Sequence, residues 1–136
     1  MDHLAKSVAD ELFQEVRRVY HERGKLTDEV LSALNFMFHG ILLPAMELVD
    51  RRNVKHVVSC SGRELFQVFG SSGVPYLCLK SSNYCSCQYY KYSVLRRGDH
   101  LMCKHMLASR LSEAMELCQE MQYTDETVAL MLARME

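Results

Sequence analysis

The sequence lacks a large excess of charge of either sign. Sixteen Lys and Arg residues stand against seventeen Asp and Glu residues, which gives a formal net charge of −1. A protein that holds nucleic acid through its overall charge carries a strong positive balance, so this class is excluded for the chain as a whole. The length of 136 residues and the 49% share of apolar residues instead predict a single globular domain over residues 1–136.

The sequence also lacks a long hydrophobic run. Its richest apolar stretch, residues 36–46, contains His39, Gly40 and Pro44 and has about half of the roughly 20 residues that a membrane helix needs. The N-terminus has no basic segment followed by an apolar run, as a secretory signal would. We therefore expect a soluble intracellular protein without membrane contact, in a reducing compartment where stable disulfides are rare.

The first part of the chain, residues 1–52, has the periodicity of helices. Residues 3–22 place apolar side chains on one stripe with charges opposite, and a second helix is predicted from Thr27 to about residue 48. Pro44 interrupts the second stripe, because proline lacks a backbone donor and crowds the carbonyl of Gly40. We expect a kink or two separate helices there.

The pattern changes to short β-like runs from Val54 onward. Three such runs, separated by turns, predict an antiparallel meander over residues 53–83: 54–58, 65–69 and 76–80. Helical periodicity then returns from about residue 105 to residue 121. A last helix, starting near Thr124, is predicted within residues 122–136.

Three of the six cysteines fall in a pattern with one histidine. Cys85 and Cys87 are followed by fifteen residues and then by Cys103 and His105, which gives C-x-C-x15-C-x-H. Thiolates and a neutral imidazole are ligands that zinc prefers, and Cys3His forms closed tetrahedral sites. On an extended segment residues i and i+2 share a face, whereas Cys103 must lie just before a helix that carries His105 in its first turn.

These elements predict an α+β fold with N-terminal helices, an antiparallel β meander and a zinc-binding β-hairpin followed by a helix. The hairpin is expected over residues 84–95 and the zinc module over residues 84–121. Because protein side chains fill all four positions around zinc, no position is left for a water nucleophile, and we expect no enzyme activity.

Two other interpretations of the cysteines stay open. One is that they are buried or incidental, and the other is thiol catalysis, for which no Asn or Asp that orients the Cys103–His105 pair can be identified. His100 is a possible replacement ligand. The remaining cysteines are interpreted as buried thiols: Cys60, Cys78 and Cys118.

The near-neutral total hides two oppositely charged segments. Residues 80–110 have a net charge of +5 and residues 111–136 a net charge of −5. Cations with interleaved tyrosines suit phosphate neutralisation and base stacking on single-stranded DNA, although a solvated basic face is the alternative. The candidate DNA contacts are the basic residues of the positive segment: Lys80, Lys91, Arg96, Arg97, Lys104 and Arg110. The acidic, methionine-rich C-terminal region is predicted to be a core helix or a surface that docks a partner.

The pattern C-x-C-x15-C-x-H is the signature of the SWIM zinc finger, and the surrounding sequence resembles the SWIM proteins of the Shu complex. The resemblance covers roughly residues 30–120, and residues 88–92 depart from it because relatives tend to have a more apolar run there. The matching stretches are AMELVD (45–50), SGR (61–63), QVFGSS (67–72), YCSC (84–87), the aromatic-rich 89–92, SVLR (93–96) and LMCKHMLA (101–108).

The resemblance implies a non-enzymatic nuclear accessory factor of homologous recombination. Such proteins pair with a RecA-type recombinase paralogue and promote recombinase filament assembly on single-stranded DNA, in repair and meiosis, without a small-molecule substrate. It assigns zinc to Cys85, Cys87, Cys103 and His105. The chain has no G-x-x-x-x-G-K-[ST] motif, so nucleotide hydrolysis must belong to the partner. The alternative function is a zinc-stabilised protein-interaction adaptor without direct DNA contact.

Overall fold

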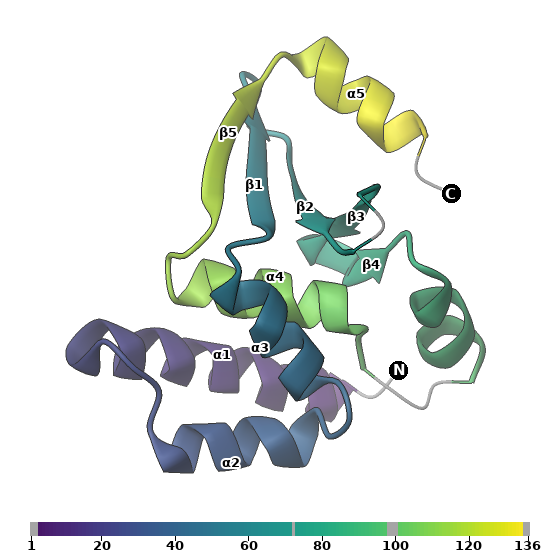
Figure 1. Ribbon diagram of the computed structural model, residues 1–136. Coiled ribbons are helices and arrows are strands. Elements are labelled where there is room, and N and C mark those ends of the chain that lie inside the picture. The colour runs from purple at the N-terminus through teal and green to yellow at the C-terminus, as the bar shows by residue number, and fades with distance from the viewer. Residues whose placement is uncertain (1–2, 72, 98–100, 135–136) are drawn as a thin grey trace.

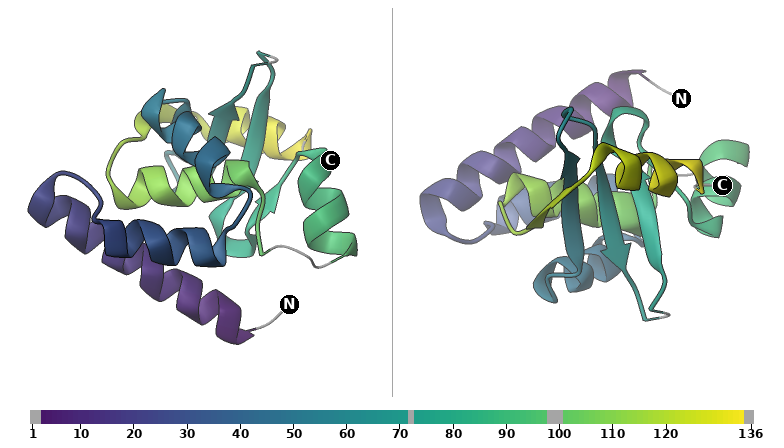
Figure 2. Two further views of the ribbon diagram at one scale, coloured as in Figure 1. Left: turned by 60° about the horizontal axis from the view of Figure 1, so that its bottom comes forward. Right: turned by 90° about the horizontal axis from the view of Figure 1, so that it is seen from above.

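A computed structural model describes residues 3–71, 73–97 and 101–134 of the chain. Helices cover one face of a five-stranded sheet, and a short C-terminal helix lies across the other face (Figures 1 and 2). The helices are α1 (His3–Arg23), α2 (Asp28–Met37), α3 (Leu42–Asp50), α4 (Lys104–Ala114) and α5 (Asp125–Ala133). No helix in the described ranges is long and apolar enough to cross a membrane.

The segment around Pro44 forms two helices, which confirms the predicted division. Thr27 caps α2, where its hydroxyl accepts a hydrogen bond from the Val30 amide at 3.3 Å. The break lies at residues 38–41, before the proline, and Gly40 supplies a left-handed backbone with φ 88°. Pro44 is the third residue of α3, where a missing N–H costs no helical hydrogen bond.

The predicted meander is confirmed, and one further strand makes the sheet mixed. The strand order is β4-β3-β2-β1-β5, with β1 to β4 antiparallel and β5 parallel to β1. The strands are β1 (Val54–Ser59), β2 (Glu64–Phe69), β3 (Pro75–Leu79), β4 (Tyr84–Cys85) and β5 (Gln119–Tyr123). A short 3₁₀ turn, η1 (Lys80–Ser82), joins β3 to β4.

The prediction that a helix runs to residue 121 is wrong. α4 ends at Ala114, and Glu116 adopts the left-handed conformation with φ 58°. The Leu117 amide donates to the Ser112 carbonyl at 2.8 Å and the Glu116 amide to the Glu113 carbonyl at 3.1 Å, the two bonds of a Schellman motif. Glycine is the usual residue at this left-handed position. Because a glutamate occupies it here, the end of the helix could not be predicted from the sequence.

The predicted zinc-binding hairpin is present, but it is formed by β3 and β4 and not by residues 84–95. The strand that contains Cys85 pairs backward with β3, in the register Cys78↔Cys85, and residues Tyr90–Arg96 form a π-helical segment, η2. Tyr90 and Val94 are both buried, and their spacing of four places them on the inner side of a helix. Burial of these two side chains packs η2 against the larger apolar core of the protein.

Two separate apolar clusters hold the layers together. The larger one lies between the sheet and the helices α1 to α4, with Phe66, Met106 and Leu111 fully buried. The smaller one lies on the opposite face under α5 and contains Val57, Leu65 and Val128. The acidic C-terminal region therefore contributes one edge strand and one helix to the fold.

His56 links three strands on the face of the sheet that carries the larger apolar cluster, where its ring lies 5.1 Å from that of Phe66. Its Nδ1 lies 2.8 Å from Glu120 Oε1 on β5, and its Nε2 lies 2.7 Å from Glu64 Oε2 on β2. Desolvation lowers the pKa of His56, but the hydrogen bonds and charges of Glu120 and Glu64 outweigh it and raise the pKa above its ordinary value. The imidazolium form, with both nitrogens donating, is the one that this arrangement stabilises.

This network predicts a pH-dependent attachment of β5. A raised folded-state pKa means that the stabilisation is fully present below the unfolded pKa and is lost as the pH rises through the folded pKa. His56→Gln should therefore lower the free energy of unfolding below pH 6.5 by up to about 1 kcal/mol, as half-exposed ion pairs do, and much less at pH 8.5. Urea unfolding in saturating zinc measures the difference. An equal loss at both pH values, or the same pH dependence from the exposed His21→Gln control, would contradict it.

Candidate metal centre

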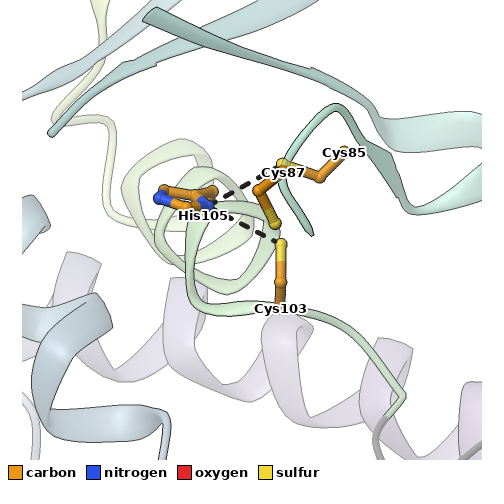
Figure 3. A group of neighbouring side chains, drawn as sticks. All are labelled: Cys85, Cys87, Cys103 and His105. Atoms are coloured by element: carbon orange, nitrogen blue, oxygen red, sulfur yellow. Dashed lines mark hydrogen bonds between the residues drawn. The ribbon is translucent and has the colours of Figure 1, made fainter. Parts of the chain in front are cut away.

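Three cysteines and one histidine converge where the β3–β4 hairpin meets the start of α4 (Figure 3). Cys85 ends β4, and Cys87 follows it two residues later. Cys103 is the N-cap of α4, and His105 is the second residue of that helix. The predicted positions of Cys103, just before the helix, and of His105, in its first turn, are confirmed.

The distances between the four side chains suit a tetrahedral ion. All four candidate ligand atoms lie within 4.8 Å of one another. The Nδ1 atom of His105 is 3.8 Å from Cys85 Sγ and 4.0 Å from Cys103 Sγ. Zinc bonds of about 2.3 Å to sulfur and about 2.0 Å to nitrogen place tetrahedral ligands roughly 3.5–3.8 Å apart. The cluster therefore needs only small adjustments to close around zinc.

The cluster is enclosed by protein. Relative exposure is 0% for Cys85 and Cys103, 4% for Cys87 and 6% for His105. The ring of Tyr76 stacks on the imidazole with 4.1 Å between centroids. This burial excludes a solvent-filled coordination position, and it suggests a structural, non-catalytic site.

Backbone amides support the sulfur atoms. The Tyr90 amide donates to Cys87 Sγ at 3.2 Å, and the Met106 amide donates to Cys103 Sγ at 3.5 Å. In the connection between the first two cysteines, Ser86 exchanges two hydrogen bonds with Leu77, at 3.0 and 3.1 Å. Donors aimed at sulfur stabilise the thiolate form, which is the form that binds metal.

The buried thiols of the cluster need a nearby positive charge to ionise together, and a dication supplies it. Hydrogen bonding with the thiols of Cys85 and Cys87, together with burial, raises the pKa of Cys103. Donation from Cys103 and Cys85 lowers the pKa of Cys87. Burial and mutual contact therefore oppose a second negative charge among the three sulfur atoms. Zinc supplies the positive charge that lets all three become thiolates, with release of protons.

Comparison with known proteins agrees with this donor set. The family model of the SWIM zinc finger matches residues 66–109. Zinc finger SWIM domain-containing protein 7 of Danio rerio is 45% identical over 94% of this chain and 91% of its own length. The proteins of that name from Mus musculus and Homo sapiens are each 41% identical, over 92% and 88% of this chain and 82% and 86% of theirs.

The chain belongs to the zinc finger SWIM domain-containing protein 7 family. No solved structure matches the chain. In this SWIM zinc finger the matched range begins in β2 and ends within α4, so it includes both elements that carry the four ligands. Zinc is the cofactor that the family and the buried cluster both indicate.

The remaining cysteines do not form a second site in the described part of the chain. Cys78 is buried on β3, as predicted, but Cys60 is exposed in the β1–β2 turn, so its interpretation as a buried thiol is wrong. Cys118 is half-buried, and desolvation raises its pKa to about 12. A thiol with so high a pKa is a poor nucleophile. His100, the possible replacement ligand, lies outside the described residues.

The six predicted DNA-contact residues separate into two groups. Lys80 lies 3.1 Å from Glu113, and Arg110 donates to Asp10 at 2.8 Å and to Asn83 at 3.2 Å. These two cations therefore tie the hairpin and α1 to α4. The other four lie on η2, just after it, or at the first position of α4: Lys91, Arg96, Arg97 and Lys104.

Loss of one ligand should remove the metal and much of the stability. Cys103→Ser replaces a sulfur by an oxygen that remains protonated, so metal analysis of chelator-free protein should fall from about one zinc per chain to less than half. The thermal unfolding midpoint should fall as well, because structural zinc supplies on the order of 10 kcal/mol in small modules. The exposed Cys60→Ser is the matched control and should keep both. A Cys103→Ser protein with full zinc and unchanged melting would refute this ligand set.

Proposed function

We propose that this protein is a non-enzymatic, nuclear subunit of a Shu-type complex that promotes homologous-recombination DNA repair. In that role it pairs with a RecA-type recombinase paralogue and assists assembly of recombinase filaments on single-stranded DNA. The observation that carries the proposal is the buried C-x-C-x15-C-x-H cluster in a chain of this SWIM family. The step from the family to recombination rests on the resemblance to Shu-complex proteins.

The zinc site supports this role by holding η2 in place. Cys87 precedes η2 and accepts from its first amide, so metal binding fixes the start of the segment. Arg96 and Arg97 are exposed at its other end, and the Arg97 guanidinium lies 5.8 Å from the exposed Tyr92 ring. Exposed cations beside an aromatic ring suit phosphate contact and base stacking. We assign DNA contact to η2 and to Lys104, which lies between two ligands of the metal centre.

A second function, an interaction adaptor without DNA contact, is favoured by one observation. Lys80 and Arg110 are paired within the protein, so part of the positive charge of residues 80–110 is neutralised internally. A smaller exposed positive surface weakens the electrostatic argument for DNA. Zinc would then serve only to shape a surface for other proteins.

A DNA titration separates these two functions. The double variant Arg96→Ala/Arg97→Ala should weaken binding to a fluorescent oligothymidylate several-fold in an anisotropy assay. Each lost phosphate contact lowers the salt slope of log K by about 0.7 for single strands, so the slope should fall by about 1.4. The charge-matched control Arg23→Ala/Lys25→Ala, at exposed positions at the far end of α1, should keep the wild-type slope. Equal binding by wild type and the η2 variant favours the adaptor.

The partner assignment is tested separately. Tagged protein purified from nuclei should bring down a RecA-type recombinase paralogue, identified by mass spectrometry, in near-equal amount. Cys103→Ser should lose that partner because the unclosed metal site no longer shapes the module, whereas Cys60→Ser should keep it. Recovery of the wild-type protein without any recombinase paralogue would overturn the Shu-type assignment and leave the zinc site untouched.

A further inference from the structure

The helices α1 and α2 form a groove at the end of the molecule opposite α5. They lie side by side, away from the sheet (Figure 1 and Figure 2, left). Two adjoining hollows of about 480 and 400 Å³ follow the seam between the helices. Both hollows are lined by Leu12, Glu15 and Ala33, so they form one continuous depression, which we call the α1–α2 groove.

One end of the groove is apolar and exposed. The larger hollow is lined there by Val8, Leu12, Phe36 and Met37. Phe36 is 91% exposed and Val8 is 46% exposed, so neither side chain is used fully in the core. A contiguous apolar surface of this kind on a small domain marks an interaction site more often than a single exposed side chain does.

Acidic side chains border the groove. Among the described residues that line the larger hollow, the charged ones are Glu11 and Glu15. The smaller hollow adds Glu22 and Glu29, against Arg18 and Arg23. Arg18 is itself paired with Glu15 and Glu22. The border as a whole is negative, so it favours an occupant with positive charge beside an apolar face.

The dimensions of the groove suit a helix. Its lining on α1 runs from Val8 to Arg23, and at 1.5 Å per residue this distance is about 22 Å. A helix of about 14 residues has the same length. A seam between two packed helices receives a third helix by accepting a stripe of side chains at i, i+3, i+4 and i+7.

We propose that the α1–α2 groove binds a basic amphipathic helix of a partner protein, about 14 residues long. Its apolar stripe contacts Phe36, Val8 and Leu12, and its Lys or Arg residues face Glu11 and Glu29, the border carboxylates that Arg18 does not pair. A second copy of this chain fits less well, because a two-fold contact would bring two negative groove borders together. Anionic lipid is disfavoured by the same charges. The proposal goes beyond the proposed function and shares no residue with the metal centre or with η2.

Peptide selection tests the proposal directly. A display library of 14-residue helical peptides carries Leu, Ile, Met or Phe at stripe positions and Lys, Glu or Gln elsewhere. Selection on the zinc-loaded wild-type protein, with counter-selection on Phe36→Asp, should enrich peptides with an excess of Lys over Glu. In fluorescence anisotropy the enriched peptide should bind Phe36→Asp at least tenfold more weakly. Leu43→Asp is the matched control, since Leu43 is 79% exposed, apolar and outside the groove.

Charge reversal provides the decisive comparison. Glu11→Lys should reverse the preference, so that a twin peptide with Glu in place of Lys becomes the tighter ligand. Enrichment without a Lys excess, equal binding by Phe36→Asp, or equal damage from Leu43→Asp would overturn the proposal. A wild-type dimer in sedimentation equilibrium that Phe36→Asp converts to monomer would also overturn it, because the occupant is then a second copy. DNA binding by Phe36→Asp stays at the wild-type level, so this result is independent of the proposed function.

Discussion

The convergence of three sulfur atoms and one imidazole on a single buried point is the constraint on which the zinc module depends. Cys85 and Cys87 come from the end of a strand, and Cys103 and His105 come from the start of α4, so closing the cluster joins sheet and helix. Burial of three thiols this close together makes more than one negative charge costly without a cation. Metal binding thus offsets the repulsion between the buried thiolates and links the sheet to the helix.

Helix α4 spreads the effect of that cross-link through the fold. It packs against α1, α3 and the four strands β1 to β4, and its buried face includes Met106, Leu107 and Leu111. Arg110, on the same helix, reaches Asp10 of α1 while its guanidinium lies 4.6 Å from the Phe13 ring. The basic residues of segment 80–110 therefore have different tasks. Arg110 and Lys80 hold elements together, whereas Arg96 at the end of η2 is exposed to solvent.

The positions of the ligands could be predicted from the sequence, whereas the structure around them could be predicted only in part. The spacing of two cysteines on an extended segment and of a Cys-x-His pair at a helix start follows from backbone geometry, and both were right. The strand β5 was missed because Met115, Cys118 and Met121 continue the helical period, while the helix stop depends on a left-handed Glu116. The η2 helix was missed because short polar runs between cysteines suit either conformation. The pairing of Lys80 with Glu113 depends on tertiary contact, which no local pattern encodes.

The parallel pairing of β5 with β1 has a consequence for the order in which the chain folds. Their register joins Lys55 to Gln119 and Ser59 to Tyr123, so all four metal ligands lie in the crossover between them. During synthesis, β1 emerges long before its neighbour, and its outer hydrogen-bonding edge stays bare in the interval. Bare strand edges recruit other chains, and contacts this distant in sequence form slowly. Metal capture by the crossover shortens the effective loop, and so the supply of zinc sets how long a nascent chain remains exposed to aggregation.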